Sequence, residues 1–184
     1  MKQVIVILLI LISVQTYSQE FKKLAVGENA IDFKLKTIQG EDLQLSKVNS
    51  NHLVVLIILR GWVGYQCPVC SRQVGQFLSE AEKLNKLGAV VLFVYPGPSI
   101  ELQAKANEFA EDFSLPEDFF FTIDPDYSMI NKYGLRWNEP KETAYPSTFV
   151  IDKDGKMVYS KISKTHGGRA KVEEVLEVLE KIYP

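Results

Sequence analysis

The stretch Leu-Val-Val-Leu-Ile-Ile-Leu-Arg-Gly-Trp-Val-Gly-Tyr-Gln-Cys-Pro-Val-Cys, residues 53–70, decides the fold of this chain. Its first seven residues are continuously apolar and rich in β-branched side chains, which predicts a central strand buried on both faces. From Pro68 to Leu87, apolar residues recur every three or four positions, which predicts a helix. The two cysteines of the chain, Cys67 and Cys70, therefore lie where a buried strand gives way to a helix.

Strands and helices alternate along the rest of the chain. The alternating segments 32–38 and 42–45 flank the turn Gln39-Gly40 and predict a small N-terminal β-hairpin. Later segments have the patterns of a second buried strand, a helix, a short strand, a short helix, a hairpin and a last helix, at residues 89–95, 102–113, 119–123, 127–133, 148–162 and 172–182. Buried strands joined through helices imply parallel pairing with right-handed crossovers. The predicted fold class is therefore α/β, with a mixed central sheet and helices on both of its faces.

The first eighteen residues have the layout of a secretory signal. Lys2 supplies a positive charge, an apolar run extends from Val4 to Val14, and a more polar stretch ends at the small residue Ser18. The apolar run is short for a membrane span. We therefore expect a signal peptide over residues 1–18 and an exported, periplasmic or otherwise extracytoplasmic domain over 19–184, without stable membrane insertion after cleavage. An uncleaved membrane anchor is the alternative.

The composition argues against several classes of partner and of site. A net charge of −2 gives no reason to expect a nucleic acid or an anionic membrane as a partner. Two cysteines are too few for a disulfide framework, and a domain of this size can build its core without one. A cysteine pair three positions apart is therefore expected to be a reactive site, and a permanent structural disulfide is the alternative.

The position of the cysteine pair predicts different roles for its two sulfurs. Pro68 suits the first position of a helix because it has no N–H group to leave unpaired there. Cys67 then lies at the helix cap, where free N–H groups and the helix dipole favour a thiolate. Cys70, one turn further, is spaced to attack a mixed disulfide formed at Cys67. We expect Cys67 to be the attacking and Cys70 the resolving cysteine, with Arg60 and Arg72 as nearby positive charges.

A second motif, Tyr145-Pro146-Ser147-Thr148, comes directly before a predicted strand. A proline that enters a strand can adopt the cis bond and leave the preceding backbone free to dock a substrate. An ordinary turn proline is the alternative.

Three motifs together resemble the thioredoxin superfamily: Leu59-Arg60-Gly61-Trp62, Cys67-Pro68-Val69-Cys70, and residues 145–152 with Gly155. They are most similar to its redoxin branch, the alkyl hydroperoxide reductase/thiol-specific antioxidant family with its peroxiredoxin-like members. The resemblance runs from near Ala25 to the end of the chain. It implies a thioredoxin-like fold and a cis Pro146 beside the cysteines.

The same resemblance implies a function and a set of supporting residues. It implies thiol-based antioxidant activity on a protein dithiol or disulfide or on a hydroperoxide, with an external thiol as reductant and no cofactor. Besides the catalytic pair Cys67 and Cys70, the residues expected to bind or support the substrate are Pro146, Tyr145, Arg60 and Trp62.

The sequence around Cys67 departs from both family patterns. Peroxiredoxin active sites resemble Pro-x-x-x-Thr/Ser-x-x-Cys, whereas Arg60 and Gly64 occupy the proline and hydroxyl positions here. Thioredoxins have a tryptophan directly before the first cysteine, where this chain has Gln66. These departures favour thiol–disulfide exchange, with a true peroxiredoxin that reduces hydroperoxides as the alternative. The family-type arginine beside the thiolate is either Arg60 or Arg169.

A copper-binding delivery protein on the same fold is a further alternative, because thiolates with an imidazole suit copper. The two histidines, His52 and His166, are not spaced as ligands around the cysteines, and we expect no metal site.

The remaining signals favour structural roles. We interpret Thr165–Arg169 as the turn into the last helix, with a functional loop as the alternative. Aromatic side chains that either rim the site or form the edge of the core are Trp62, Tyr65, Trp137 and Tyr145.

Overall fold

The structure is a computed structural model that describes residues 24–182. The expected signal peptide, residues 1–18, lies outside the described residues. Within residues 24–182, no helix combines the length and the apolar character needed to cross a membrane.

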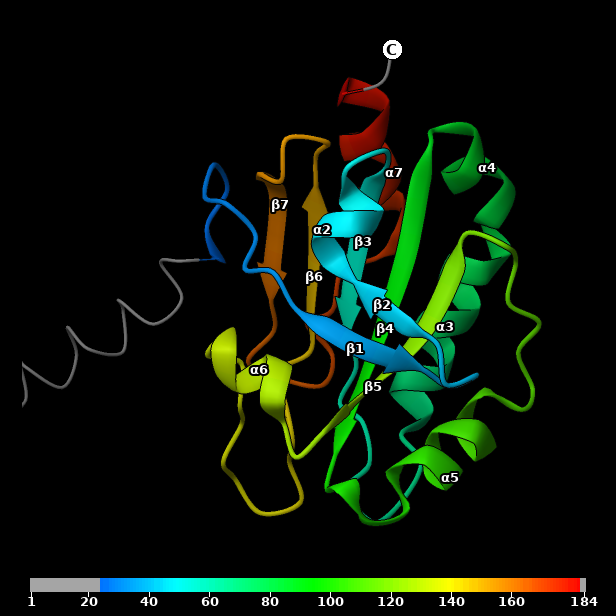
Figure 1. The fold of residues 1–184 in the computed structure, drawn as a ribbon, viewed down its shortest axis with the longest axis vertical. Coiled ribbons are helices and arrows are strands. Elements are labelled where there is room, and N and C mark those ends of the chain that lie inside the picture. The colour runs from blue at the N-terminus through cyan, green and yellow to red at the C-terminus, as the bar shows by residue number, and fades with distance from the viewer. Residues whose placement is uncertain (1–23, 183–184) are drawn as a thin grey trace, which may run out of the picture.

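The described residues form a seven-stranded mixed sheet with the strand order β2-β1-β5-β4-β3-β6-β7 (Figure 1). The strands are β1 (Lys34–Thr37), β2 (Asp42–Gln44), β3 (Leu53–Ile58), β4 (Ala89–Gly97), β5 (Phe119–Pro125), β6 (Ser147–Ile151) and β7 (Met157–Ile162). The three central strands β3, β4 and β5 pair in parallel. The hairpins β1–β2 and β6–β7 join them with antiparallel pairing. Both predicted hairpins and the parallel centre are therefore confirmed.

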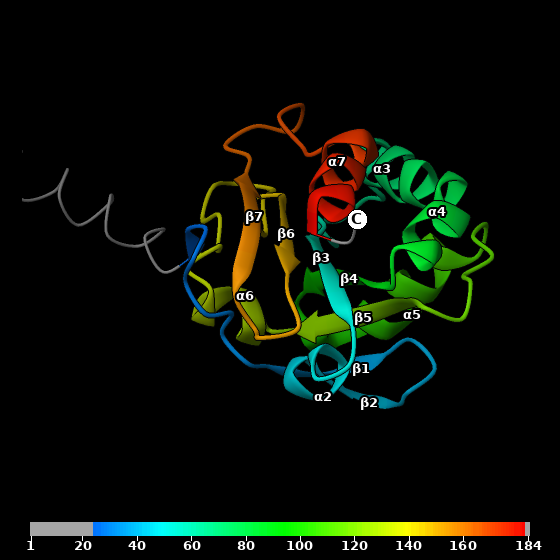
Figure 2. The same cartoon turned by 90° about the horizontal axis from the view of Figure 1, so that it is seen from above.

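Helices cover both faces of the sheet, as expected. They are α2 (Leu45–Asn49), α3 (Pro68–Ser79), α4 (Ala81–Lys86), α5 (Ser99–Ala110), α6 (Ser128–Lys132) and α7 (Val172–Ile182). Figure 2 shows α3, α4 and α7 on one side of the sheet and α2 and α6 on the other. Residues of α5 pack into the same core as α3, α4 and α7.

Strand β3 contributes to both cores, which explains why it is apolar throughout. Val55 and Ile57 pack into the core under α3 and α7. Val54 and Leu56 pack into the core under α2 and α6. All four side chains are fully buried. Because each face of the strand meets a helical layer, the sequence shows a continuous apolar run instead of an alternation.

Two elements differ from the expectation. The helix expected over residues 68–87 is divided at Glu80, whose backbone leaves the helical region (φ −107°, ψ 15°). The apolar period continues across the break because Phe77 and Leu84 are buried in the same core, so the sequence pattern does not reveal it. The second hairpin strand ends at Gln44, and α2 follows it. The backbone N–H of Ser46 donates to Asp32 Oδ1 at 2.9 Å, a contact over fourteen positions that a local pattern does not indicate.

Candidate active site

Cys67 caps the first turn of α3, as predicted. Its backbone is extended (φ −87°, ψ 109°), Pro68 occupies the first helical turn, and Cys67 Sγ accepts a hydrogen bond from Cys70 N at 3.4 Å. The side chain is only 3% exposed, and that of Cys70 is fully buried. Both cysteines are free thiols in this structure. The helix start thus offers a sulfur anion at Cys67 an N–H donor and the positive end of the helix dipole.

The two sulfurs have opposite acidities. A hydrogen bond from the Cys70 side chain lowers the pKa of Cys67 from 9.0 to about 5, against the effect of burial and with help from the Cys70 N–H group and from the charges of Arg169 and Arg60. Burial and the hydrogen bond to Cys67 raise the pKa of Cys70 well above its ordinary value. At neutral pH, Cys67 is therefore the thiolate and Cys70 the thiol that donates to it.

Arg169 contacts the buried sulfur directly. Its Nη2 donates to Cys70 Sγ at 3.3 Å, its Nη1 to Gln73 Oε1 at 2.8 Å, and its Nε to the carbonyl oxygen of His166 at 3.2 Å. The side chain of Arg169 is only 9% exposed. The loop that we interpreted as the turn into the last helix, with a functional loop as the alternative, leads into α7 and also brings a cation to the cysteines.

Arg60, at the end of β3, is the second buried cation of the site. Its Nε donates to Glu142 Oε2 at 2.8 Å and its Nη1 to the Tyr65 hydroxyl at 2.5 Å, while its Nη2 donates to the carbonyl oxygen of Lys141. Burial opposes its charge, but the hydrogen bonds with Tyr65 and Glu142 outweigh burial and raise the pKa of Arg60. The charges of both Arg60 and Arg169 favour the thiolate at Cys67.

The chain can turn from β3 toward Cys67 only because residue 61 is a glycine. Gly61 has a φ of +74°, and a Cβ atom there would lie 1.9 Å from the carbonyl oxygen of Pro96. The next residue, Trp62, donates its backbone N–H to the same oxygen at 2.9 Å. The Trp62 ring is partly buried beneath the ammonium group of Lys105, 4.8 Å from the ring centroid. Trp62 thus anchors the loop to the end of β4.

Two of the three positions that depart from the family patterns, Gly64 and Gln66, have distinct environments. Gly64 has a φ of +101°, a region that side-chain-bearing residues rarely adopt, so a hydroxyl residue there would be strained. Gln66 accepts from the Tyr95 hydroxyl at 2.7 Å and donates to the carbonyl oxygen of Lys105 at 2.9 Å. Gln66 therefore ties the residue before Cys67 to β4 and α5.

Pro146 lies beside the end of β3, because Ser147 of β6 pairs with Ile58 of β3. The expectation of a cis bond at Pro146 is wrong, since no peptide bond between residues 24 and 182 is cis. Trans is the lower-energy isomer, and in this arrangement the Pro146 carbonyl oxygen accepts from Ser163 N at 2.9 Å. The preceding Tyr145 stacks on Trp137, with the ring centroids 5.0 Å apart.

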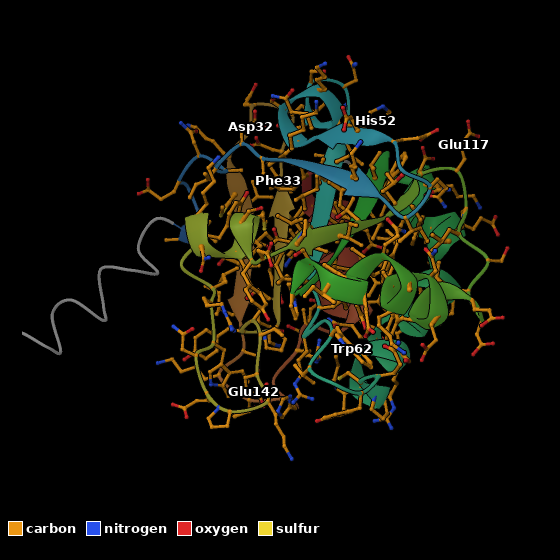
Figure 3. All side chains as sticks on the ribbon, turned by 60° about the horizontal axis from the view of Figure 1, so that its bottom comes forward. Asp32, Phe33, His52, Trp62, Glu117 and Glu142 are labelled. Atoms are coloured by element: carbon orange, nitrogen blue, oxygen red, sulfur yellow. The ribbon has the colours of Figure 1, made fainter. Side chains whose placement is uncertain are left out.

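Two residues of the site were missed in the sequence. Gln73 lies one helical turn after Cys70, and that spacing could have indicated a shared face of α3. Glu142 lies in the segment before β6, 82 positions from its partner Arg60, and no local signal identifies it. In Figure 3, Glu142 and Trp62 lie at the same end of the molecule.

The opposite end of the molecule carries His52, which Figure 3 shows far from Trp62 and Glu142. His52 lines a surface hollow of about 320 Å³ together with Val90 and Phe120, away from the cysteines. His52 therefore cannot join Cys67 and Cys70 in one metal site. Among residues 24–182, no three histidine, cysteine or acidic side chains are arranged to hold a metal ion.

Known proteins are similar to this chain in sequence. The model of the AhpC/TSA family matches residues 26–160. Thiol-disulfide oxidoreductase ResA of Geobacillus thermodenitrificans is 30% identical over 186 residues, which cover 97% of this chain and 94% of that protein. Peroxiredoxin Bcp of Bacillus subtilis is 28% identical over 138 residues, 72% of this chain and 82% of that one.

A solved structure shows the same fold. The structure of peroxidoxin BcpB from Mycobacterium tuberculosis matches with a TM-score of 0.69 at 23% identity, over 86% of this chain and 98% of that chain. The chain therefore belongs to the AhpC/TSA family, in the redoxin branch of the thioredoxin superfamily, and is a thiol-dependent oxidoreductase.

Proposed function

We propose that the protein is a thiol–disulfide oxidoreductase in which Cys67 attacks the substrate and Cys70 resolves the mixed disulfide. The observation that carries this proposal is the asymmetry of the pair. Cys67 lies at the start of α3 with a pKa lowered to about 5, whereas Cys70 is fully buried and its pKa is raised. A thiolate at the helix start and a protonated thiol one turn inward are the states that attack and resolution require.

The reaction proceeds in two exchanges. The Cys67 thiolate attacks one sulfur of a substrate disulfide, the substrate S–S bond breaks, and the other substrate sulfur leaves as a thiolate that takes up a proton. Cys70 then loses its proton and attacks Cys67 Sγ, which releases the second substrate thiol and forms the Cys67–Cys70 disulfide. The substrate gains two electrons and the protein loses two. Arg169, 3.3 Å from Cys70 Sγ, stabilises the resolving thiolate as it forms.

Single-cysteine variants test this assignment. With a dithiol reductant and insulin as the disulfide substrate, we expect the wild type to accelerate reduction and Cys67→Ser to be inactive. Cys70→Ser is expected to accumulate a mixed disulfide at Cys67, visible as a mass adduct that a reductant removes. An adduct on Cys70 in the Cys67→Ser variant, with none in Cys70→Ser, would reverse the assignment.

Gly64 favours a disulfide over a peroxide as the substrate. Its φ of +101° disfavours the hydroxyl residue that the peroxiredoxin pattern has at this position. Stopped-flow mixing with hydrogen peroxide and with a small disulfide separates the two functions. We expect Cys67 to react with peroxide no faster than a free thiolate of the same pKa. A much faster reaction with peroxide would identify a true peroxiredoxin.

We also propose that the mature protein acts outside the cytoplasm with an external thiol as its reductant. The supporting observation is the charged, apolar and polar order of residues 1–18, followed by a redox pair. N-terminal sequencing of the protein from fractionated cells is expected to begin after Ser18 in the extracytoplasmic fraction. An intact Met1 in the cytosolic fraction would contradict export.

A further inference from the structure

Glu142 joins the two loops that bring cations to the cysteines. Its Oε2 accepts from Arg60 Nε at 2.8 Å, and its Oε1 accepts from Arg60 Nη2 at 3.3 Å and from His166 Nε2 at 3.0 Å. The carbonyl oxygen of His166 in turn holds Arg169, which contacts Cys70. The carboxylate is 11% exposed and the Arg60 side chain 5%, so the pair is little screened by water.

The backbone around Glu142 is shaped for this contact. Lys141 has a φ of +63°, unusual for a residue with a side chain, and its carbonyl oxygen accepts from Arg60 Nη2. Glu142 N donates to the carbonyl oxygen of Glu139 at 3.0 Å and closes the turn. Strained residues of this kind persist where the surrounding contacts require them. The turn therefore presents a carbonyl oxygen and a carboxylate to one guanidinium.

We propose that the negative charge of Glu142 sets how strongly the charge of Arg60 favours the thiolate form of Cys67. This deepens the proposed function, on which it rests, by identifying what regulates the reactivity of the attacking sulfur. Glu142 makes no hydrogen bond to either cysteine; its negative charge acts on Cys67 beside the positive charge of Arg60, to which it is bound. The guanidinium attracts the thiolate, and the carboxylate bound to it offsets part of that attraction, because the two charges lie within hydrogen-bond distance.

Arg60 keeps its place without the carboxylate. The Tyr65 hydroxyl and the Lys141 carbonyl oxygen still accept from its Nη1 and Nη2, and the Tyr65 ring lies 5.0 Å from its central carbon. A glutamine at position 142 also retains one oxygen for Arg60 Nε. The change Glu142→Gln therefore removes the negative charge and leaves the positive charge where it is.

The test measures the pKa of Cys67 in the reduced full-length protein by recording the ultraviolet absorbance of the thiolate as a function of pH. We expect Glu142→Gln to lower this pKa by about one unit and to make the Cys67–Cys70 disulfide more oxidising against glutathione. Glu142→Asp, which keeps the charge, is expected to stay close to the wild type. Glu139→Gln is the matched control: it removes an exposed charge from the same turn, away from Arg60, and is expected to change neither quantity.

A double variant keeps the proposal testable if Glu142→Gln does not fold. Arg60→Met with Glu142→Leu replaces a buried ion pair by apolar side chains, a change that folded proteins commonly tolerate. Because the two charges offset each other, we expect the Cys67 pKa of this variant to lie closer to the wild type than that of Arg60→Met alone, which should be about one unit higher.

Two results would overturn the proposal. One is a Cys67 pKa in folded Glu142→Gln that equals or exceeds the wild-type value. The other is a double variant whose pKa matches that of Arg60→Met alone. Neither readout depends on turnover, so a protein that fails to reduce insulin would contradict the proposed function and leave this inference to be decided by the titration.

Discussion

The two buried arginines of the site have different surroundings. Arg60 is bound by the carboxylate of Glu142, which offsets part of its positive charge. Arg169 donates, within the described residues, to an amide oxygen of Gln73, a carbonyl oxygen and the Cys70 sulfur, all of which are neutral in the reduced protein. The charge of Arg169 is therefore uncompensated, and of the two arginines it favours the Cys67 thiolate more strongly.

This difference indicates a division of roles. An uncompensated cation in contact with the resolving sulfur stabilises negative charge on either cysteine as it moves between them. A compensated cation at the end of β3 adjusts the acidity of Cys67 by a smaller amount. The two loops also differ in packing at their glycines, because a Cβ atom at Gly61 would meet backbone and one at Gly168 would meet a side chain.

The largest expected effect is on the free energy of unfolding when a glycine in one of the two loops is replaced by alanine. Gly61→Ala would bring Cβ within 1.9 Å of the Pro96 carbonyl oxygen at a φ of +74°, so backbone must move. We expect a loss of about 4 kcal/mol in the free energy of unfolding. Gly168→Ala would instead meet the Ser163 hydroxyl at 2.5 Å, a side chain that can rotate away only by giving up its hydrogen bonds with Thr165. The cost should be about 2 kcal/mol.

Urea unfolding of both variants checks this order. Gly167→Ala is the control, since a Cβ atom there would meet nothing within 4 Å, and it should be close to neutral. Equal losses in the free energy of unfolding for Gly61→Ala and Gly168→Ala would show that the two loops tolerate an added methyl group equally.

Features set by neighbouring residues could be predicted from the sequence. The double burial of β3, the helix start at Pro68 and the cap at Cys67 all follow from residues 53–70, where each local preference agrees with the final fold. The roles expected for the two sulfurs followed from the same stretch.

Features that depend on loops meeting across the sheet could not be predicted. Arg169 reaches Cys70 over 99 positions, and Glu142 reaches Arg60 over 82. Their approach is set by the pairing of β6 with β3 and by the loop after β7. The sequence singled out both arginines but carried no sign that one of them is paired with a carboxylate.

The combined effect of the Cys70 hydrogen bonds and of both arginine charges on Cys67 should appear in the pH dependence of stability. The native pKa of Cys67 is lowered from 9.0 to about 5, so between these values the unfolded chain binds more protons than the native one. The stability that this thiolate contributes is complete above the unfolded value and is lost as the pH falls through the native value. From about pH 5 to 8, the reduced protein should therefore gain on the order of 1 kcal/mol per pH unit relative to Cys67→Ser.

Denaturant unfolding of the reduced protein and of Cys67→Ser at several pH values measures this slope. Taking the difference between the two proteins cancels the titration of the other groups. The raised pKa of Cys70 contributes only near and above 9.0, outside this range. Parallel curves for the two proteins would show that the site does not stabilise a thiolate at Cys67.

The smallest expected effect is on the pKa of Cys67, and it compares the two arginines most directly. Arg169 is replaced alone, whereas Arg60 is replaced together with Glu142. Arg169→Met removes an uncompensated charge, so we expect the Cys67 pKa to rise by about one to two units. Removal of Arg60 together with Glu142 removes an offset pair and should raise it by less than about half a unit.

Arg169→Lys distinguishes charge from contact in this comparison. A lysine keeps the charge but lacks the planar fork that reaches Gln73 and Cys70 at once. We therefore expect Arg169→Lys to have a Cys67 pKa between those of the wild type and Arg169→Met. We also expect it to resolve the mixed disulfide more slowly, measured by quenching the exchange and detecting the adduct by mass spectrometry. If Arg169→Met and the Arg60/Glu142 pair variant raised the pKa equally, the two arginines would act on Cys67 in the same way, and the carboxylate would not distinguish them.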